Sequence, residues 1–199
     1  MKSIIRIFLA VVAAMSVTVA LTQLSPEKAK KSEEILIKMR QIDLLNYIVP
    51  LVLTKDQINK LLVVVEKCRS KVDQVRNDEA AELLKFESKV TDAINKGINK
   101  DITPGKTLMI ELNNNLTKLA FRRQLVGDEN ADLVLAVFKK ELNEGQRKAA
   151  MNAHDIKAFD PRVDVSKLTD DDKLRFFIKD VILDPHAYDL LIRISKVER

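Results

Sequence analysis

Residues 54–97 read TKDQINKLLVVVEKCRSKVDQVRNDEAAELLKFESKVTDAINKG, and no proline or glycine interrupts this stretch before Gly97. Its first half carries apolar residues at alternating spacings of three and four: Ile58, Leu61, Val65, Cys68, Val72 and Val75. This heptad pattern is typical of a helix that packs one apolar stripe against a partner helix. We therefore expect one long helix from about residue 54 to residue 97.

The apolar pattern of this stretch changes beyond Val75. Val72 and Leu83 are separated by an eleven-residue step, and the stripe resumes at Phe86, Val90 and Ile94. An eleven-residue step relaxes the left-handed supercoil that a strict heptad imposes. The sequence therefore predicts a long curved helix and not a coiled-coil rod.

The rest of the chain also has helical periodicity. Helix starts and stops are indicated by capping residues, proline and glycine. The first predicted helix begins at Ser25-Pro26, has Ile35, Met39, Ile42 and Leu45 on its stripe, and ends before Pro50. A second runs from Thr103-Pro104 to Gly127. Further helices are expected from Asp128, from Asn143 towards His154, from Thr169 and from Asp184-Pro185, with a linker over residues 155–166.

The composition supports an all-α fold. Of 199 residues, 46% are hydrophobic and 32% charged, with only 4 Gly and 5 Pro. These values exclude a collagen-like rod and a disordered tail. The scarcity of Gly and Pro leaves few tight turns, which argues against a strand-rich sandwich or barrel.

The N-terminus is typical of an export signal. Lys2 and Arg6 precede a stretch without charge, Ile7–Leu21, as in the basic and apolar regions of a signal peptide. We expect residues 1–20 to be removed, so that the mature chain begins near Leu21. The alternative is that residues 4–21 remain as a membrane anchor. Both interpretations place the protein in the periplasm or another extracytoplasmic compartment.

The charge balance argues against nucleic acid as a partner. The chain has 34 basic and 29 acidic residues, and loss of Lys2 and Arg6 would leave 32 basic residues. This excess is mild, and the chain lacks the clustered basic stripe of a nucleic-acid-binding protein.

Cys68 is the single cysteine, so no disulfide can form within the chain. Its place in the apolar stripe favours burial, and pairing with Cys68 of a second chain is the alternative.

Two predicted helix starts share a pattern. Leu53-Thr54-Lys55-Asp56-Gln57 and Leu142-Asn143-Glu144-Gly145-Gln146 each place a leucine, a capping residue and a glutamine at the same spacing. In each, the capping oxygen can accept from the backbone N–H three residues on, and the glutamine can reach back to the N–H of the cap. Two ordinary capping boxes in an unrelated helical protein are the alternative to a family motif.

In an exported, helical chain this pair of motifs resembles the Spy/CpxP family of periplasmic proteins, whose hallmark is two Leu-Thr-x-x-Gln motifs. Residues 53–57 match this hallmark, whereas Asn143 replaces the threonine in the second copy. The resemblance implies a domain of helical hairpins over residues 21–154. Residues 155–199 have no counterpart in the family, and their residue pattern predicts a linker and two short helices. The resemblance further implies a homodimer that acts as an ATP-independent chaperone for unfolded or partly folded envelope proteins, or as a modulator of envelope stress.

No pattern of residues indicates an enzyme. His154 and His186 lack the spacing of a metal motif, and the few glycines form no phosphate-binding loop. The run Asp170-Asp171-Asp172 is explained by its predicted place at a helix N-terminus. We therefore assign no catalytic, cofactor-binding or metal-binding residue. The alternative to a chaperone is a subunit that is anchored in the membrane and helps to assemble an envelope complex.

Overall fold

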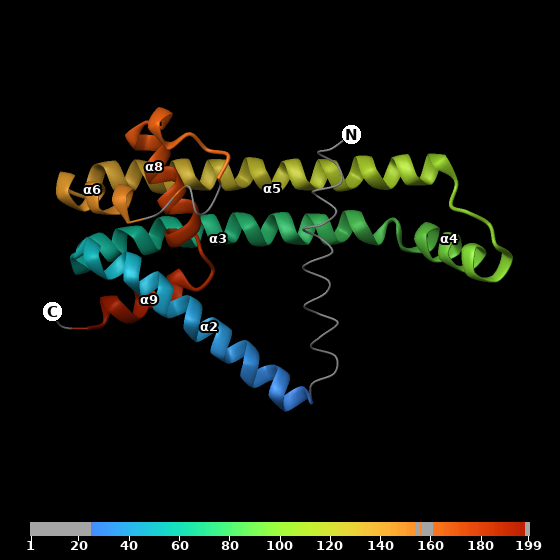
Figure 1. The fold of residues 1–199 in the computed structure, drawn as a ribbon, viewed down its shortest axis with the longest axis horizontal. Coiled ribbons are helices and arrows are strands. Elements are labelled where there is room, and N and C mark those ends of the chain that lie inside the picture. The colour runs from blue at the N-terminus through green and yellow to red at the C-terminus, as the bar shows by residue number, and fades with distance from the viewer. Residues whose placement is uncertain (1–24, 154–155, 157–160, 198–199) are drawn as a thin grey trace. The chain divides into compact units, whose positions relative to one another are not determined.

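The computed structural model describes residues 25–153, 156 and 161–197, and the regular structure of this part of the chain is entirely helical (Figure 1). The predicted all-α class is therefore confirmed. The chain divides into two units between Leu45 and Asn46. The predicted signal peptide lies outside the described residues. Among the helices that are described, none has both the length and the apolar character needed to cross a bilayer.

The first described helix, α2, spans Pro26–Ile48. It begins at a proline, whose fixed φ suits the first helical turn, and the Ser25 Oγ accepts from the backbone N–H of Lys28 at 3.4 Å. Both predicted ends of this helix are confirmed. Three residues of its predicted stripe, Ile35, Met39 and Ile42, are exposed. A short 3₁₀ helix, η1, follows at Val49–Leu51 and contains Pro50.

The predicted single helix over residues 54–97 requires a correction. The chain forms α3 at Lys55–Leu84 and α4 at Glu87–Lys100, and it leaves the α-helix at Lys85 and Phe86. Glu82, Phe86, Val90, Ala93 and Gly97 are the half-buried positions on either side of this break. Glu82, Phe86 and Val90 follow one another at spacings of four, whereas a heptad alternates spacings of three and four. The pattern is therefore one residue longer than a heptad at Phe86. The break absorbs this extra residue and keeps the stripe on one side.

The prediction that Gly127 ends a helix is wrong. A single helix, α5, runs through this glycine from Lys106 to Glu141. A glycine in the interior of a helix lowers helix stability by only about 1 kcal/mol relative to alanine. The residues that follow Gly127 offset this cost, because Asn130, Ala131, Val134, Leu135 and Phe138 are buried. Burial of an aliphatic or aromatic side chain contributes about 1.5–3 kcal/mol. Asp128 therefore lies inside α5 and caps no helix.

The core of the unit formed by residues 46–199 lies between α3 and α5, which run antiparallel (Figure 1). Ile58, Leu61, Val65 and Cys68 of the predicted stripe are buried, whereas Val72 and Val75 are half-buried. Three further elements pack on this pair: α8 (Asp170–Phe177), the π-helical η3 (Ile178–Ile182) and α9 (Ala187–Ser195). The rings of Phe138 and Phe177 meet with their centroids 6.2 Å apart. The helical elements between Asp170 and Ser195 thus share the core of α3 and α5.

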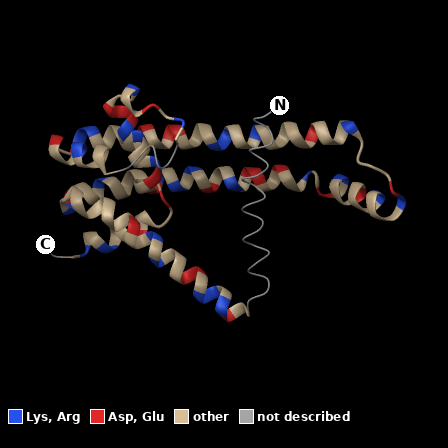
Figure 2. Ribbon diagram, in the orientation of Figure 1, with Lys and Arg blue, Asp and Glu red and all other residues tan. Residues whose placement is uncertain are grey.

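Towards α4 ion pairs also join the two helices, and Figure 2 shows charged residues along both of them. The Arg123 guanidinium binds the carboxylate of Glu79 at 2.7 Å, and Arg122 binds Glu82 at 3.0 Å. Glu79 is only 4% exposed, so its carboxylate depends on this partner. We call residues 76–126 the arm.

Candidate functional site

The two predicted motifs lie at adjacent helix starts. Thr54 caps α3, and Asn143 caps the short helix α6 (Glu144–Asn152), as the sequence predicts. Leu53 and Leu142, which precede the caps, are both buried. Burial of the two leucines holds each chain entry in the core, so that the caps are fixed in position.

Both helix starts form complete capping boxes. The Gln57 backbone N–H donates to Thr54 Oγ1 at 3.2 Å, and the Thr54 N–H donates to Gln57 Oε1 at 2.9 Å. In the second box, the Gln146 N–H donates to Asn143 Oδ1 at 2.9 Å, and the Asn143 N–H donates to Gln146 Oε1 at 3.0 Å. Asparagine caps a helix as well as threonine does, so the capping box forms at Asn143 although the motif has threonine at this position.

The two glutamines of the capping boxes also bind each other. Gln57 Nε2 donates to Gln146 Oε1 at 2.9 Å, and Gln146 Nε2 donates to Gln57 Oε1 at 3.0 Å. The second N–H of each amide reaches a backbone carbonyl, Glu141 for Gln57 at 2.7 Å and Val52 for Gln146 at 3.3 Å. Each accepting carbonyl lies two residues before the opposite cap. We call this reciprocal arrangement the glutamine clasp.

The backbone at Val52 is strained beside the clasp. Its φ of 47° and ψ of 48° lie in the left-handed region, which a β-branched residue rarely adopts. Its own N–H donates to the Val49 carbonyl at 3.1 Å, while its carbonyl accepts from Gln146. The strained turn therefore ends η1 and directs a carbonyl at the clasp, so it joins the start of α3 to α6.

The clasp is built for holding helices and not for chemistry. Both N–H groups of each amide are used, and each Oε1 accepts two hydrogen bonds, which is its full capacity. Neither glutamine retains a free group for a substrate. The sequence indicated both capping boxes but not the contact between them, because the two motifs come together only when α3 and α5 pair.

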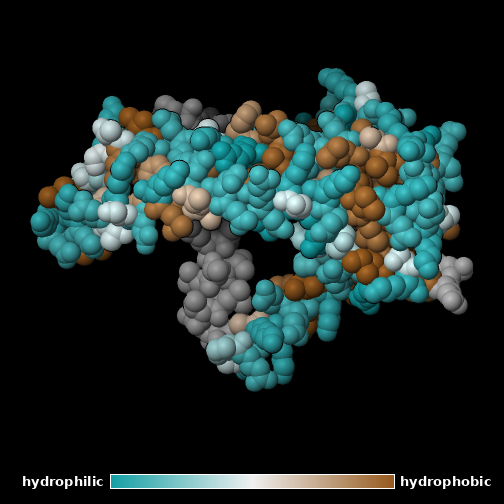
Figure 3. All heavy atoms as spheres, turned by 180° about the vertical axis from the view of Figure 1, so that it is seen from behind, coloured by the Kyte–Doolittle hydropathy of each residue, from teal (hydrophilic) through white to brown (hydrophobic). Residues whose placement is uncertain are grey.

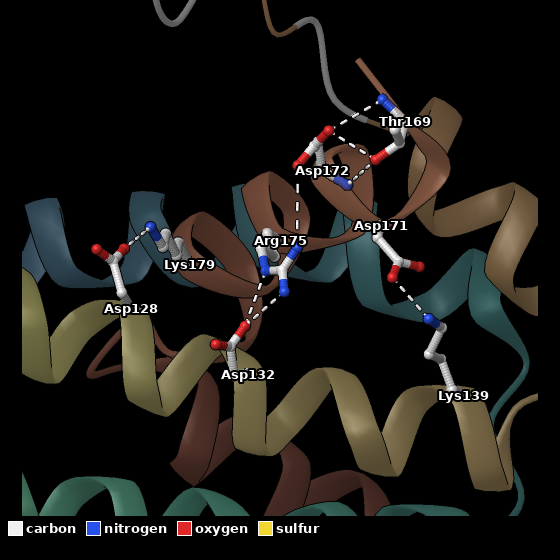
Figure 4. A network of polar contacts seen from close by, with 8 residues as sticks. All are labelled: Asp128, Asp132, Lys139, Thr169, Asp171, Asp172, Arg175 and Lys179. Atoms are coloured by element: carbon white, nitrogen blue, oxygen red, sulfur yellow. Dashed lines mark hydrogen bonds and ion pairs between the residues drawn. The ribbon is translucent and has the colours of Figure 1, made fainter.

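The acidic run at the start of α8 is engaged in contacts within the chain (Figure 4). Thr169 Oγ1 donates to the Asp172 carboxylate at 2.6 Å, and this hydrogen bond lowers the pKa of Asp172. Asp171 binds Lys139 at 2.6 Å. The described residues contain no cluster of three or more potential metal ligands. His154 lies outside the described residues, and the His186 backbone N–H donates to Asp184 at 2.8 Å.

Cys68 is buried within the pair of α3 and α5. The thiol lies 3.8 Å from the Asn130 carbonyl oxygen, and burial raises the pKa of this thiol above its usual value. A buried, protonated thiol is a poor nucleophile. Its environment agrees with the predicted structural role and disfavours a disulfide to a second chain.

Searches with models of protein families, among curated proteins and among solved structures found no match to this chain.

Proposed function

We propose that this protein is an exported helical binding protein that holds unfolded or partly folded envelope proteins without ATP. The observation that carries this proposal is the number of large apolar side chains that stay exposed along the arm. Phe121 is 67% exposed and Leu116 58%. Further exposed members are Leu83, Leu84, Ile94, Ile98, Ile102, Met109, Ile110 and Leu125.

These side chains are distributed among charges and do not form a single apolar face. Figure 3 shows hydrophobic patches interrupted by hydrophilic surface along the paired helices. A chaperone of this kind needs contacts that are weak, reversible and tolerant of sequence, because its clients differ. Dispersed apolar side chains provide such contacts, and neighbouring charges accelerate the first encounter. The two capping boxes at Thr54 and Asn143, whose sequences resemble the motif pair of the Spy/CpxP family, support the proposal.

The test is aggregation of a chemically reduced or acid-denatured model protein, followed by light scattering, with increasing amounts of the protein lacking residues 1–20. We expect suppression without ATP. The double variant Leu116→Gln and Phe121→Gln should suppress aggregation less, because it removes two exposed apolar side chains while keeping good helix formers. Asn113→Gln with Thr117→Gln is the matched control, since both residues are exposed on the same helix.

Absence of suppression at several-fold molar excess of folded protein would contradict the proposal. If the two double variants suppress aggregation equally, the exposed apolar side chains of the arm do not bind the client. Recovery of the protein in one large envelope complex, without suppression, would instead support the assembly-subunit alternative.

A further inference from the structure

Helix α2 carries a row of large apolar side chains on its exposed side. Ile35, Leu36, Met39 and Ile42 are each between 57% and 62% exposed. All four belong to the unit that ends at Leu45. Single exposed apolar residues are ordinary on a protein surface, but a contiguous row of them is typical of an interaction site.

The other side of α2 is already packed. Leu44 is fully buried and Ile37 is half-buried, and both lie on the side of the helix away from Ile35 and Ile42. A helix that is apolar on two sides is typical of a position between two partners. Leu44 is covered within its own chain, whereas the row at residues 35–42 remains for another molecule.

The spacing of the row and the charges beside it fit a second copy of the same helix. Ile35, Met39 and Ile42 follow one another at spacings of four and three, the spacing of a coiled-coil seam. Lys38 lies along one flank of this seam and Asp43 along the other. In a parallel pair in register, a residue on the first flank meets the residue five positions later on the second copy, so Lys38 meets Asp43. By symmetry this ion pair forms twice.

The flanking charges also distinguish between the two orientations of such a pair. Asp43 binds Arg40 of its own chain at 2.6 Å, and its carboxylate can accept a further hydrogen bond from Lys38 of the second copy. An antiparallel pair brings each flank beside the same flank of the second copy. Within α2 the flank of Lys38 otherwise holds Lys31 and Leu45, so Lys38 would then meet no carboxylate. The charges therefore favour the parallel pair.

We propose that α2 binds a second copy of this chain, parallel and in register. Ile35, Met39 and Ile42 form the centre of the interface, and the ion pairs of Lys38 with Asp43 form its edges. The seam covers about two helical turns, so the dimer is weak and forms reversibly. The interface lies outside the arm, so it is separate from the surface that holds clients in the proposed function.

Sedimentation equilibrium of the protein lacking residues 1–20, from micromolar to millimolar concentration, tests the interface. We expect the mass to rise from that of one chain to that of two. Met39→Glu with Ile42→Glu should abolish this rise, because four carboxylates would meet in an apolar seam. Lys30→Glu, at an exposed position on the opposite side of α2, changes the net charge equally and should leave the dimer intact.

A second pair of variants tests the charges. Lys38→Glu should raise the dissociation constant about tenfold, because two attractions between the copies become repulsions. Lys31→Glu is the matched control. Lys31 lies on the same flank seven residues earlier, where it would meet the apolar Leu36 of the second copy, so its substitution should have the smaller effect.

A cysteine variant tests the orientation. In a parallel pair in register the two copies of residue 35 lie side by side, so Ile35→Cys should form a disulfide-linked dimer under mild oxidation, whereas Lys30→Cys should not. The proposal is overturned if the protein stays monomeric at every concentration, whether or not its apolar face then binds lipid vesicles. It is also overturned if the double glutamate variant dimerises as the wild type does, or if the two cysteine variants cross-link equally. None of these outcomes bears on the aggregation test of the proposed function.

Discussion

At the scale of single residues, the glutamine clasp is the most specific feature of the chain. A glutamine in a capping box ordinarily satisfies only its own helix start. Here Gln57 and Gln146 each satisfy their own cap and the opposite amide at the same time. The start of α3 and the start of α6 are therefore stabilised together, and loss of either glutamine leaves polar groups of the other without a partner.

We expect the two glutamines to be energetically coupled. Gln57→Ala and Gln146→Ala should each lower the free energy of unfolding by about 1–2 kcal/mol, from the lost cap and the unpaired groups. The double variant should cost less than the sum of the two by about 1 kcal/mol. Urea denaturation of the four proteins measures this coupling, and Gln74→Ala, at an exposed position of α3, is the control. Strictly additive effects would contradict the clasp.

At the scale of elements, α3 and α5 are held together differently along their length. Between residues 58 and 68 of α3, apolar burial dominates, whereas the arm contains the ion pairs of Glu79 and Glu82. Exposed ion pairs contribute little, but a buried carboxylate that loses its partner is costly. The stability of the arm therefore depends more on Arg123 than on the exposed ion pairs.

Arg123→Ala should lower the free energy of unfolding by about 1–3 kcal/mol, because Glu79 remains buried without its guanidinium. Arg76→Ala is the matched control, since Arg76 and its partner Asp73 are both largely exposed. Its effect should stay within about 0.5 kcal/mol. Equal stabilities of the two variants, measured by urea denaturation, would show that the buried pair does not stabilise the arm.

The continuity of α5 through Gly127 leads to a second prediction at this scale. A Cβ atom added at Gly127 would meet no heavy atom within 4 Å, and its φ is not positive. Gly127→Ala should therefore raise the free energy of unfolding by about 0.5–1 kcal/mol, because alanine is the better helix former and restricts the unfolded chain. A lower thermal unfolding midpoint than that of the wild type would contradict a regular helix at this position.

At the scale of the whole molecule, the segment after residue 160 completes the unit that α3 and α5 begin. Phe177, Ile178, Val181, Ile182 and Leu191 are buried completely, and Leu190 nearly so. Around this apolar contact, Lys179 binds Asp128, Arg175 binds Asp132 and Asp171 binds Lys139 (Figure 4). The buried apolar side chains stabilise the contact of this segment with α5. The ion pairs around them favour one position of α8 along α5.

Stability should fall in acid, with a contribution from Asp172. The Thr169 hydroxyl lowers the pKa of Asp172, and Arg122 lowers that of Glu82. A carboxyl whose pKa is lower in the folded state stabilises the fold above its ordinary pKa, and this stabilisation is lost as the pH falls through the lowered value. The denaturant midpoint should therefore decrease below about pH 4. In Asp172→Asn the decrease should be smaller, and an unchanged pH profile would contradict the contribution of Asp172.

Local sequence signals were sufficient to predict the helical class and several helix ends. Scarce glycine and proline, heptad spacing and capping residues act over a few residues, so they were sufficient to predict α2, the start of α3, α6, α8 and the position of both capping boxes. Local signals failed where their free-energy differences were small. Gly127 did not end α5, because the burial of neighbouring side chains outweighed the low helix propensity of glycine. One extra residue in the heptad interrupted the long helix at Lys85 and Phe86, although neither residue is proline or glycine.

Which distant residues meet could not be predicted from local sequence signals. The contacts between Gln57 and Gln146, Glu79 and Arg123, and Cys68 and Asn130 all require the antiparallel register of α3 and α5. That register arises from the summed burial of many side chains, and no single motif encodes it.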